Sequence, residues 1–349
     1  MCAAIGQSLA QKYRPANFND MTEQALVVDL VKSMCESDSL PNRNFLFIGP
    51  AGTGKTTLAK IIANELNQGK GAPIEIDAAS HSGVDDVRAL VQQASQYPIG
   101  MDYKVIILDE CHSLSSNAWQ VLLLPIEAQV AKTVWIFCTT NPEKIPPTIL
   151  SRVQTFQLSK ISLQGIYNRL KYVLECEIAE GREISYTDDA ISYVAKLANG
   201  GMRDALTLLD KCLAYNLNVT SENVVTALDI PNYDIYFNLL NALVKKDNQA
   251  VTEIVNSVYN SGANFVKWFE AFHGFIANII KYIYIKDISA TIIPSIYLSK
   301  LEKYSEQHAG LCLKLSNILL ALNKDLKNTQ YLEETALTYL LSPVAKKGG

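Results

Sequence analysis

Along the first 160 residues, short apolar runs alternate with segments in which apolar residues recur at helical spacing. The runs end in glycine or polar residues, as buried strands of a parallel sheet do. They lie at residues 45–48, 73–77, 104–109 and 134–138. Helices are predicted at residues 25–36, after residue 57 and from residue 82. This alternation predicts an α/β domain over residues 1–159.

From about residue 160 the strand signals fade and helical periodicity takes over. Three helices are predicted at residues 162–178, 187–198 and 201–215. Asp229-Ile230-Pro231 is typical of a boundary, so we predict a helical domain at 160–229 and an all-α domain at 230–349. Six helices are predicted beyond the boundary, at residues 233–245, 248–260, 263–286, 294–305, 308–327 and 329–341. The tail Lys346–Gly349 is expected to fray.

Residues 49–57 fill the spacing G-x-x-x-x-G-K-[ST] between the first strand and a helix, which is the context of a nucleotide-binding P-loop. The glycines allow positive φ and bring backbone N–H groups close to phosphate oxygens. Lys55 is predicted to contact the β and γ phosphates of ATP, and the Thr56 hydroxyl to help hold Mg²⁺. The predicted phosphate-loop residues are Gly49, Pro50, Ala51, Gly52, Thr53, Gly54, Lys55, Thr56 and Thr57.

Two acidic residues, Asp109 and Glu110, end the strand at 104–109. That strand should deliver them to the edge of the sheet where α/β proteins bind ligands. We expect Asp109 to complete the Mg²⁺ shell and Glu110 to polarise the water that attacks the γ-phosphate. Thr140 and Asn141 follow the next strand and could hydrogen-bond the γ-phosphate or that water. His112 could act as a general base, but we interpret it as a polar surface residue that senses a neighbouring helix.

Several further residues have two interpretations. Residues 9–24 are either an N-terminal strap or, through Tyr13, Arg14 and Pro15, the pocket for the adenine base. Arg152 is either an ordinary surface charge or an arginine finger for a neighbouring subunit. Arg203 lies in the first turn of a predicted helix, where a cation opposes the helix dipole and suggests a nucleotide phosphate as its partner. A helix start with His81, Ser82 and Arg88 is either solvated surface or a contact to DNA phosphates.

Composition narrows the class of protein. The chain has 349 residues, 48% of them hydrophobic, and a formal net charge of −4, which says nothing for or against nucleic acid. Its opening Met1–Gly6 is too short for a secretory signal, and its apolar runs are too short to span a bilayer, so a cytoplasmic protein without membrane contact is expected. The seven cysteines are scattered without a C-x-x-C pair, so no structural zinc is expected.

Taken together, these motifs resemble the AAA+ motor subunits of sliding-clamp loaders, in particular the bacterial γ/τ type. The matching segments are LAQKYRPANF at 9–18, GPAGTGKTT at 49–57, IEIDAAS at 74–80, LDECH at 108–112, TTNPEKIPPTILSR at 139–152 and GGMRDAL at 200–206. The resemblance is strong over residues 9–215 and weaker beyond residue 230. It implies an AAA+ domain, a helical lid at 160–229 and a helical collar at 230–349 that mediates oligomerisation.

The resemblance also implies a function. The chain would be an ATP-driven subunit that opens a sliding clamp and loads it on primer-template DNA, within a pentameric ring of clamp-loader subunits. Tyr13, Arg14 and Pro15 would bind adenine, Arg203 would sense the phosphates in cis, and Arg152 would act in trans. His81, Ser82 and Arg88 would contact the DNA backbone without reading its sequence.

Three features depart from the bacterial pattern. The segment Asn67–Gly71 closes a gap that in the family holds a four-cysteine zinc insertion, Val153 replaces a cysteine, and the sequence lacks the τ tail after the collar. Two alternatives remain open. One is another AAA+ DNA motor, such as a branch-migration or fork-repair ATPase, and the other is a nucleotide-binding scaffold subunit without activity. The filled catalytic positions argue against the scaffold.

Overall fold

The computed structural model describes residues 7–36, 44–128, 132–230, 233–262 and 264–345. The chain divides into two compact units, residues 1–219 and 220–349, and each is described by itself. The expectations for Met1–Gly6, Pro231 and Lys346–Gly349 lie outside the described residues.

The first unit is built on a parallel sheet, as predicted. Within the described residues its five strands lie in the order β2-β3-β4-β1-β5. Their bounds are β1 Asn44–Ile48, β2 Ile74–Asp77, β3 Lys104–Asp109, β4 Thr133–Thr139 and β5 Gln154–Gln157. The inner strands β1, β3 and β4 are almost wholly buried, whereas β2 and β5 are half-exposed edge strands. This burial explains why the inner strands read as continuous apolar runs.

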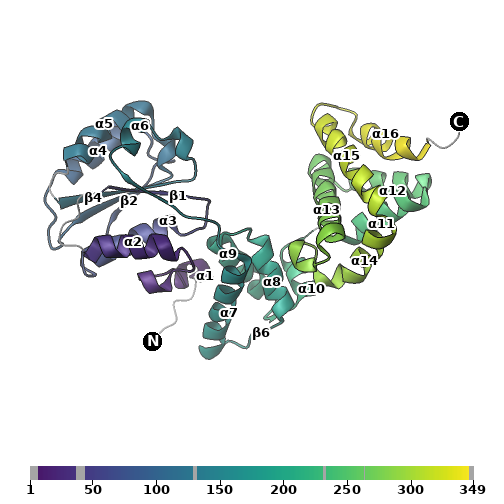
Figure 1. Cartoon of the computed structure of the whole chain (residues 1–349), viewed down its shortest axis with the longest axis horizontal. Helices are drawn as coiled ribbons and strands as arrows, with labels where there is room; N and C mark the ends of the chain where they lie inside the picture. The colour runs from purple at the N-terminus through teal and green to yellow at the C-terminus, as the bar shows by residue number, and fades with distance from the viewer. Residues whose placement is uncertain (1–6, 37–43, 129–131, 231–232, 263, 346–349) are drawn as a thin grey trace. The chain divides into compact units, whose positions relative to one another are not determined.

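Helices cover both faces of this sheet (Figure 1). On one face Val28 and Val31 of α2 and Leu58 and Ile62 of α3 pack against the apolar side chains of β1. The other face is covered mainly by α4 and α5. The helices of this layered domain are α2 Ala25–Glu36, α3 Lys55–Leu66, α4 Val84–Ala94, α5 Ser116–Ala128 and α6 Pro147–Leu150.

A helical part completes the first unit. It contains α7 Leu163–Ala179, α8 Asp188–Leu197 and α9 Met202–Tyr215, together with a two-stranded sheet of β6 Ser185–Tyr186 and β7 Asn218–Val219. Side chains of Ser162 and Thr187 cap the first two helices by accepting hydrogen bonds from the N–H groups of Gly165 and Ala190. The short N-terminal helix α1 Leu9–Lys12 packs on α9.

The structure corrects several local expectations. The N-terminal strap at residues 9–24 contains α1 and a 3₁₀ turn, η1 Phe18–Asp20. The helix predicted from residue 82 begins at Val84. Its N-cap is Gly83, which makes no side-chain hydrogen bond, so Ser82 does not cap the helix. The strand β5 has weak alternation and was not predicted. Residues between Pro142 and Leu150 form two short helical turns rather than an irregular loop.

The second unit is all-helical, as predicted. In its described part, a short helix α10 Ser221–Ala227 precedes six longer ones. These are α11 Tyr233–Lys245, α12 Asn248–Asn260, α13 Phe265–Ile285, α14 Leu298–Gln307, α15 Ala309–Leu326 and α16 Leu332–Ala345. Phe269, Phe272 and Phe275 of α13 are buried in its core, as their helical spacing predicts, and Trp268 packs partly buried beside them.

The α13 aromatic cluster provides a test of this core. We expect Phe272→Ala to lower the free energy of unfolding of the second unit by about 3–5 kcal/mol, because the ring is fully buried. Its ring centroid lies 5.6 Å from that of Tyr236 and 5.7 Å from that of Trp268. Tyr284→Ala is the matched control, since this aromatic side chain of the same helix is 71% exposed. Urea unfolding monitored by far-UV circular dichroism measures both, and equal losses would contradict the assigned core.

Candidate functional site

The first unit contains a cavity of about 600 Å³ at the carboxyl edge of its sheet. The lining residues come from the N-terminal strap, the phosphate loop, the ends of β2 and β3, and helices α7 and α9. They include Tyr13, Arg14, Pro15, Ala51, Gly52, Thr53, Gly54, Lys55, Thr56, Thr57, Asp109, Glu110, Arg169 and Arg203. The structure therefore brings most of the predicted nucleotide-binding residues to one place.

The phosphate loop joins β1 to α3 through residues with left-handed backbone. Gly52 has φ +72° and Gly54 has φ +103°, a region that side chains with a Cβ rarely adopt. A Cβ on Gly52 would also lie 3.1 Å from the Cα of Gly201. The loop thus needs glycine both for its turn and for its close approach to the start of α9. It ends at the N-terminus of α3, where the helix dipole and free N–H groups favour an anion.

Lys55 is the first residue of α3 and only 6% exposed. Its Nζ donates hydrogen bonds to the carbonyl oxygens of Gly49 at 2.8 Å and Pro50 at 2.9 Å. Burial lowers the pKa of Lys55, and the nearby Glu110 carboxylate opposes that change. The loop carbonyls hold the ammonium group in place, so the charge is directed at the cavity instead of being free in solvent.

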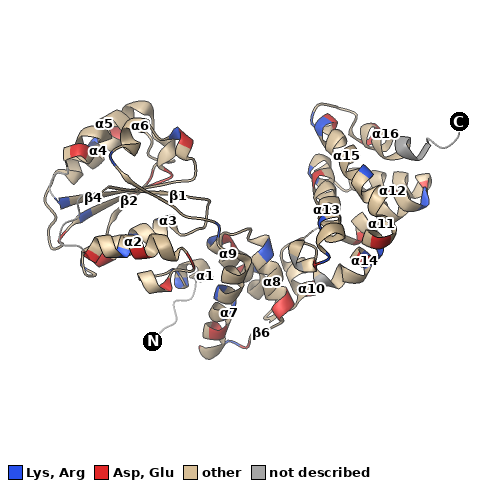
Figure 2. Ribbon diagram, viewed as in Figure 1, with Lys and Arg blue, Asp and Glu red and all other residues tan. Residues whose placement is uncertain are grey.

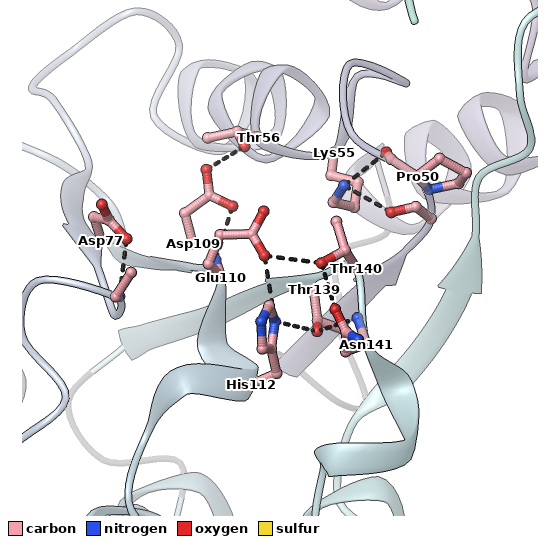
Figure 3. Close-up of polar contacts among 12 residues, drawn as sticks. Pro50, Lys55, Thr56, Asp77, Asp109, Glu110, His112, Thr139, Thr140 and Asn141 are labelled. Atoms are coloured by element: carbon pink, nitrogen blue, oxygen red, sulfur yellow. Dashed lines mark hydrogen bonds and ion pairs between the residues drawn. The ribbon is translucent and has the colours of Figure 1, made fainter. Parts of the chain in front are cut away.

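Thr56 and Asp109 lie against each other across the cavity floor. The Thr56 hydroxyl donates to Oδ2 of Asp109 at 2.6 Å (Figure 3). A hydroxyl and a carboxylate oxygen form the donor set that Mg²⁺ prefers, since this ion takes few protein oxygens and completes its shell with phosphate and water oxygens. These two residues therefore fit a magnesium ion bound together with a nucleotide.

Glu110 follows β3 in a left-handed conformation, φ +46°. For a residue with a long side chain this backbone costs about 1–3 kcal/mol, and such strain is concentrated at functional sites. Its Oε2 lies 3.1 Å from the Thr140 hydroxyl and 3.2 Å from Nδ1 of His112. These contacts come from the end of β4 and from the turn after β3, and they fix where the carboxylate lies (Figure 3).

Thr139, Thr140 and Asn141 form the adjoining end of β4. The Thr140 hydroxyl lies 2.8 Å from Oδ1 of Asn141, and the backbone N–H of Asn141 donates to the buried Thr139 hydroxyl at 3.0 Å. Thr140 thus contacts Glu110 directly, and Asn141 is linked to it through the Thr140 hydroxyl. Thr140 and Asn141 do not line the cavity in the way that Glu110 does, so their contact with a nucleotide stays a prediction.

His112 was interpreted wrongly from the sequence. Its side chain is 16% exposed and lies beside Glu110. Nδ1 also lies 3.1 Å from the hydroxyl of Thr139. The turn η2 Cys111–Ser113 carries the imidazole, which lies below the Glu110 carboxylate in Figure 3. The sequence pattern does not show that the imidazole lies between Glu110 and Thr139.

The strap and α9 form the remaining walls. Nε of Arg14 donates to the Thr57 hydroxyl at 3.2 Å, and this bond ties the strap to the phosphate loop. The N–H of Met202 donates to the carbonyl oxygen of Gly52 at 2.9 Å, so the start of α9 is bonded to the same loop. Arg203 follows and lines the cavity. Its position in the first turn of α9 therefore has a local explanation in the anion site beside it.

Sequence reasoning missed Arg169 in the middle of α7. Its Nη2 donates to the carbonyl oxygen of Tyr13 at 3.0 Å, and it lines the cavity. An arginine inside an amphipathic helix carries no sequence signal that separates this position from an ordinary solvent-facing charge.

Arg152 and the predicted DNA-contact residues lie outside the cavity. Nη1 of Arg152 donates to the Thr148 carbonyl oxygen at 2.8 Å, and its Nε lies 3.3 Å from a carboxylate oxygen of Glu127. His81, Ser82 and Arg88 lie at the start of α4, where Arg88 forms an exposed ion pair of 3.0 Å with Asp85. The structure thus separates these residues from the cis site.

Comparison with known families agrees with this geometry. Residues 45–160 match the ATPase family associated with various cellular activities (AAA). Residues 165–217 match the DNA polymerase III clamp loader subunit, ATPase lid domain. The DNA polymerase III subunit gamma/tau of Mycoplasma genitalium is 30% identical over 331 residues, which are 88% of this chain and 54% of the relative. The DNA polymerase III subunit gamma of Buchnera aphidicola subsp. Schizaphis graminum is 31% identical over 73% of this chain and 75% of its own length.

The fold and the site define an AAA ATPase with a nucleotide-binding P-loop. More narrowly, the chain belongs to the family of DNA polymerase III clamp-loader subunits of the gamma/tau type. It spans about half the length of the gamma/tau and tau relatives, 54% in Mycoplasma genitalium and 50% in Bacillus subtilis.

Solved structures support the fold. The Holliday junction branch migration motor RuvB of Thermotoga maritima superposes with a TM-score of 0.52 at 20% identity, over 67% of this chain and 80% of that protein. In the described ranges, no helix is long and apolar enough to cross a membrane. The same residues contain no cluster of three or more His, Cys, Asp or Glu side chains that could hold a metal ion.

The position of Glu110 leads to a direct test. We expect Glu110→Gln to lower ATP turnover by a factor of about 10²–10⁴, because the amide cannot accept a proton from an attacking water. ATP affinity should change little, since Lys55 and Thr56 remain. Steady-state turnover and equilibrium binding of ATP measure the two effects. Turnover at the wild-type rate in this variant would exclude Glu110 as the group that activates water.

Proposed function

We propose that the chain is an ATP-driven motor subunit of a sliding-clamp loader, which opens the clamp and loads it on primer-template DNA. One observation carries this proposal: a cavity in the first unit that is lined by the phosphate loop, Asp109, Glu110 and Arg203, with Arg152 outside it. The match of residues 165–217 to a clamp-loader lid and the gamma relatives support the choice among AAA ATPases.

In the proposed reaction, Lys55 and Arg203 bind the β and γ phosphates of ATP, and the loop N–H groups hold the remaining oxygens. Glu110 orients the attacking water and accepts its proton, while Thr140 and His112 keep the carboxylate in place. Thr140 and Asn141 are the cis residues at the strand edge that would report the γ-phosphate. Tyr13, Arg14 and Pro15 bind the adenine end.

Thr56 and Asp109 would hold Mg²⁺ between the phosphate loop and β3. When bound, the ion would neutralise charge that develops on the β and γ oxygens. The contribution of the chain is to place the Thr56 hydroxyl and the Asp109 carboxylate 2.6 Å apart before nucleotide arrives. Such preorganisation limits the rearrangement needed on binding.

Arg152 is proposed to act on the cavity of a neighbouring subunit in a pentameric ring. Its ion pair with Glu127 is partly exposed, and the two side chains are 34% and 63% accessible. Exposed pairs of this kind contribute at most about 1 kcal/mol, so a nucleotide phosphate can replace Glu127 as the partner. Hydrolysis would then depend on the alignment of adjacent subunits.

The alternative AAA+ DNA motors are less well supported. The similarity to RuvB is at 20% identity and concerns the fold alone. By contrast, the Replication factor C subunit 4 of Encephalitozoon cuniculi is 30% identical over 72% of this chain and 79% of its own length. The proposed partners are therefore other clamp-loader subunits, a sliding clamp and the phosphate backbone of primer-template DNA.

For DNA, we propose the start of α4 as the contact, with His81, Ser82 and Arg88. Acidic and basic residues are interspersed on the helices of each unit (Figure 2), so a local contact is needed. Arg88 is 65% exposed and its partner Asp85 is 94% exposed, so a DNA phosphate can compete for the guanidinium group. Asp85 and Asp86 in the first turn of α4 repel a phosphate anion. The proposed contact therefore depends on Arg88.

Arg152→Ala tests the trans assignment. We expect ATP affinity of the isolated chain to stay near the wild-type value, because Arg152 lies outside the cavity. Turnover of the assembled ring should fall by about 10³–10⁵, the usual contribution of an arginine finger. Equilibrium nucleotide binding and steady-state turnover measure the two effects.

A mixing experiment provides the control. Lys55→Ala subunits cannot bind phosphates but still offer Arg152 to a neighbour, so mixing them with Arg152→Ala subunits should restore part of the activity. A mixed ring that forms, as shown by native mass spectrometry, and yet remains inactive would place Arg152 in cis.

Arg88→Ala tests the DNA contact. We expect weaker DNA stimulation of ATP turnover and a log affinity versus log salt slope that is smaller in magnitude by about one unit, the change for one lost phosphate contact. Lys171→Ala is a matched control, because this exposed lysine on α7 forms a comparable surface ion pair with Asp188 on α8. Unaltered stimulation and salt slope in Arg88→Ala would remove α4 from the DNA interface.

A further inference from the structure

Glu177 on α7 is a buried carboxylate outside the phosphate site. It is 3% exposed, and in the described part of the chain it and Lys55 are the charged residues that are more than nine-tenths buried. A buried charge is strongly unfavourable unless hydrogen bonds and opposite charges compensate it. Lys55 has a clear use in phosphate binding, whereas the proposed reaction does not involve Glu177.

The partners of Glu177 show what it holds. Its Oε1 accepts hydrogen bonds from Nζ of Lys12 at 2.6 Å and from the Tyr13 hydroxyl at 2.8 Å. Its Oε2 accepts from Nη1 of Arg182 at 2.6 Å. Burial by itself would raise the pKa of Glu177, but the hydrogen bonds from Lys12, Arg182 and Tyr13 outweigh it and lower the pKa to about 2. Glu177 is therefore ionised throughout the working pH range.

Two of these three donors belong to the strap that forms the base-binding end of the cavity. Tyr13 lines the cavity beside Arg14 and Pro15. The same helix makes a second bond to this segment, because Arg169 donates to the Tyr13 carbonyl oxygen at 3.0 Å. The N–H of Leu9, at the start of α1, donates to Asp210 of α9 at 2.7 Å. The strap is thus fixed on the helical part of the unit by polar groups, while Arg14 joins it to the phosphate loop.

We propose that Glu177 is a positioning residue for nucleobase binding: its carboxylate fixes Lys12 and Tyr13 on α7 and so shapes the part of the cavity that receives the base. This inference rests on the proposed binding of adenine by Tyr13, Arg14 and Pro15. It predicts that Glu177 affects the base end of ATP and leaves the triphosphate end unchanged. A purely structural buried ion cluster would show no such distinction between the two ends of the ligand.

Glu177→Gln in the full chain tests the proposal. The amide has nearly the same volume but lacks the negative charge, and its NH₂ group cannot accept from the donors. We expect the Kd of ATP to rise by about tenfold, the loss expected when hydrogen bonds to a charged group disappear from a binding site. The Kd of inorganic tripolyphosphate, measured with Mg²⁺ by the same calorimetric titration, should stay within about twofold of wild type because the phosphate loop is untouched.

Two further variants make the test decisive. Glu180→Gln is the matched control: among the described residues this 57% exposed carboxylate at the same helix end bonds to Lys12 and not to Tyr13, so the ATP affinity of the variant should match wild type. Tyr13→Phe keeps the ring and removes the hydroxyl that donates to Glu177, so it should weaken the binding of ATP and not that of tripolyphosphate. It therefore decides the question even if Glu177→Gln does not fold.

The outcomes are distinct. Selective loss of ATP affinity in Glu177→Gln or Tyr13→Phe supports the positioning role. Equal changes for ATP and tripolyphosphate, or no change for either ligand in folded variants, would reduce Glu177 to a structural ion cluster. The titrations use no clamp and no DNA, so a failure of the clamp-loading proposal would leave their result unaffected.

Discussion

The parallel pairing of β4 with both β1 and β3 is the constraint on which the site depends. Residues Asn44–Ile48 pair with Trp135–Thr139, and Lys104–Leu108 pair with Thr133–Phe137. Three strands therefore end at one edge in a fixed order, with β4 in the middle. The phosphate loop follows β1, the acidic pair follows β3, and the polar end of β4 lies between them. The contact of Thr140 with Glu110 follows from this order.

The second physical theme is the cost of burying charge. Nζ of Lys55 is held by carbonyl oxygens of the phosphate loop. The Glu177 carboxylate is held by hydrogen-bond donors that include Lys12 of the N-terminal strap. Both arrangements keep an ionised group at a fixed position in a poorly solvated environment, where its interactions are stronger than in water. In the proposed function, Lys55 would prepare the triphosphate end of the cavity and Glu177 would support the base end.

Polar contacts tie segments around the cavity to one another. Met202 bonds to the phosphate loop, and the side chain of Gln24 forms paired hydrogen bonds with the backbone of Ser159 at 2.6 Å and 3.2 Å. Polar contacts of this kind can exchange with a ligand, whereas the close-packed apolar clusters on the two faces of the sheet cannot. This arrangement fits the function proposed above, in which the helical part would respond to the nucleotide.

The sequence by itself determined the fold class, the inner strands and the main helices, because apolar runs and helical spacing reflect burial directly. It also identified the phosphate loop and the acidic pair, since their chemistry requires particular residue types at fixed spacing. The half-exposed strand β5 gave no such pattern.

Only the tertiary structure decided which distant residues meet. The turn η2 places His112 beside Thr139, which is 27 positions later in the chain. Helix α7 brings Arg169 and Glu177 to the strap, which lies more than 150 positions earlier. A lone arginine or glutamate in an amphipathic helix looks the same whether it faces solvent or a buried partner. The difference arises from long-range packing, which local sequence patterns do not encode.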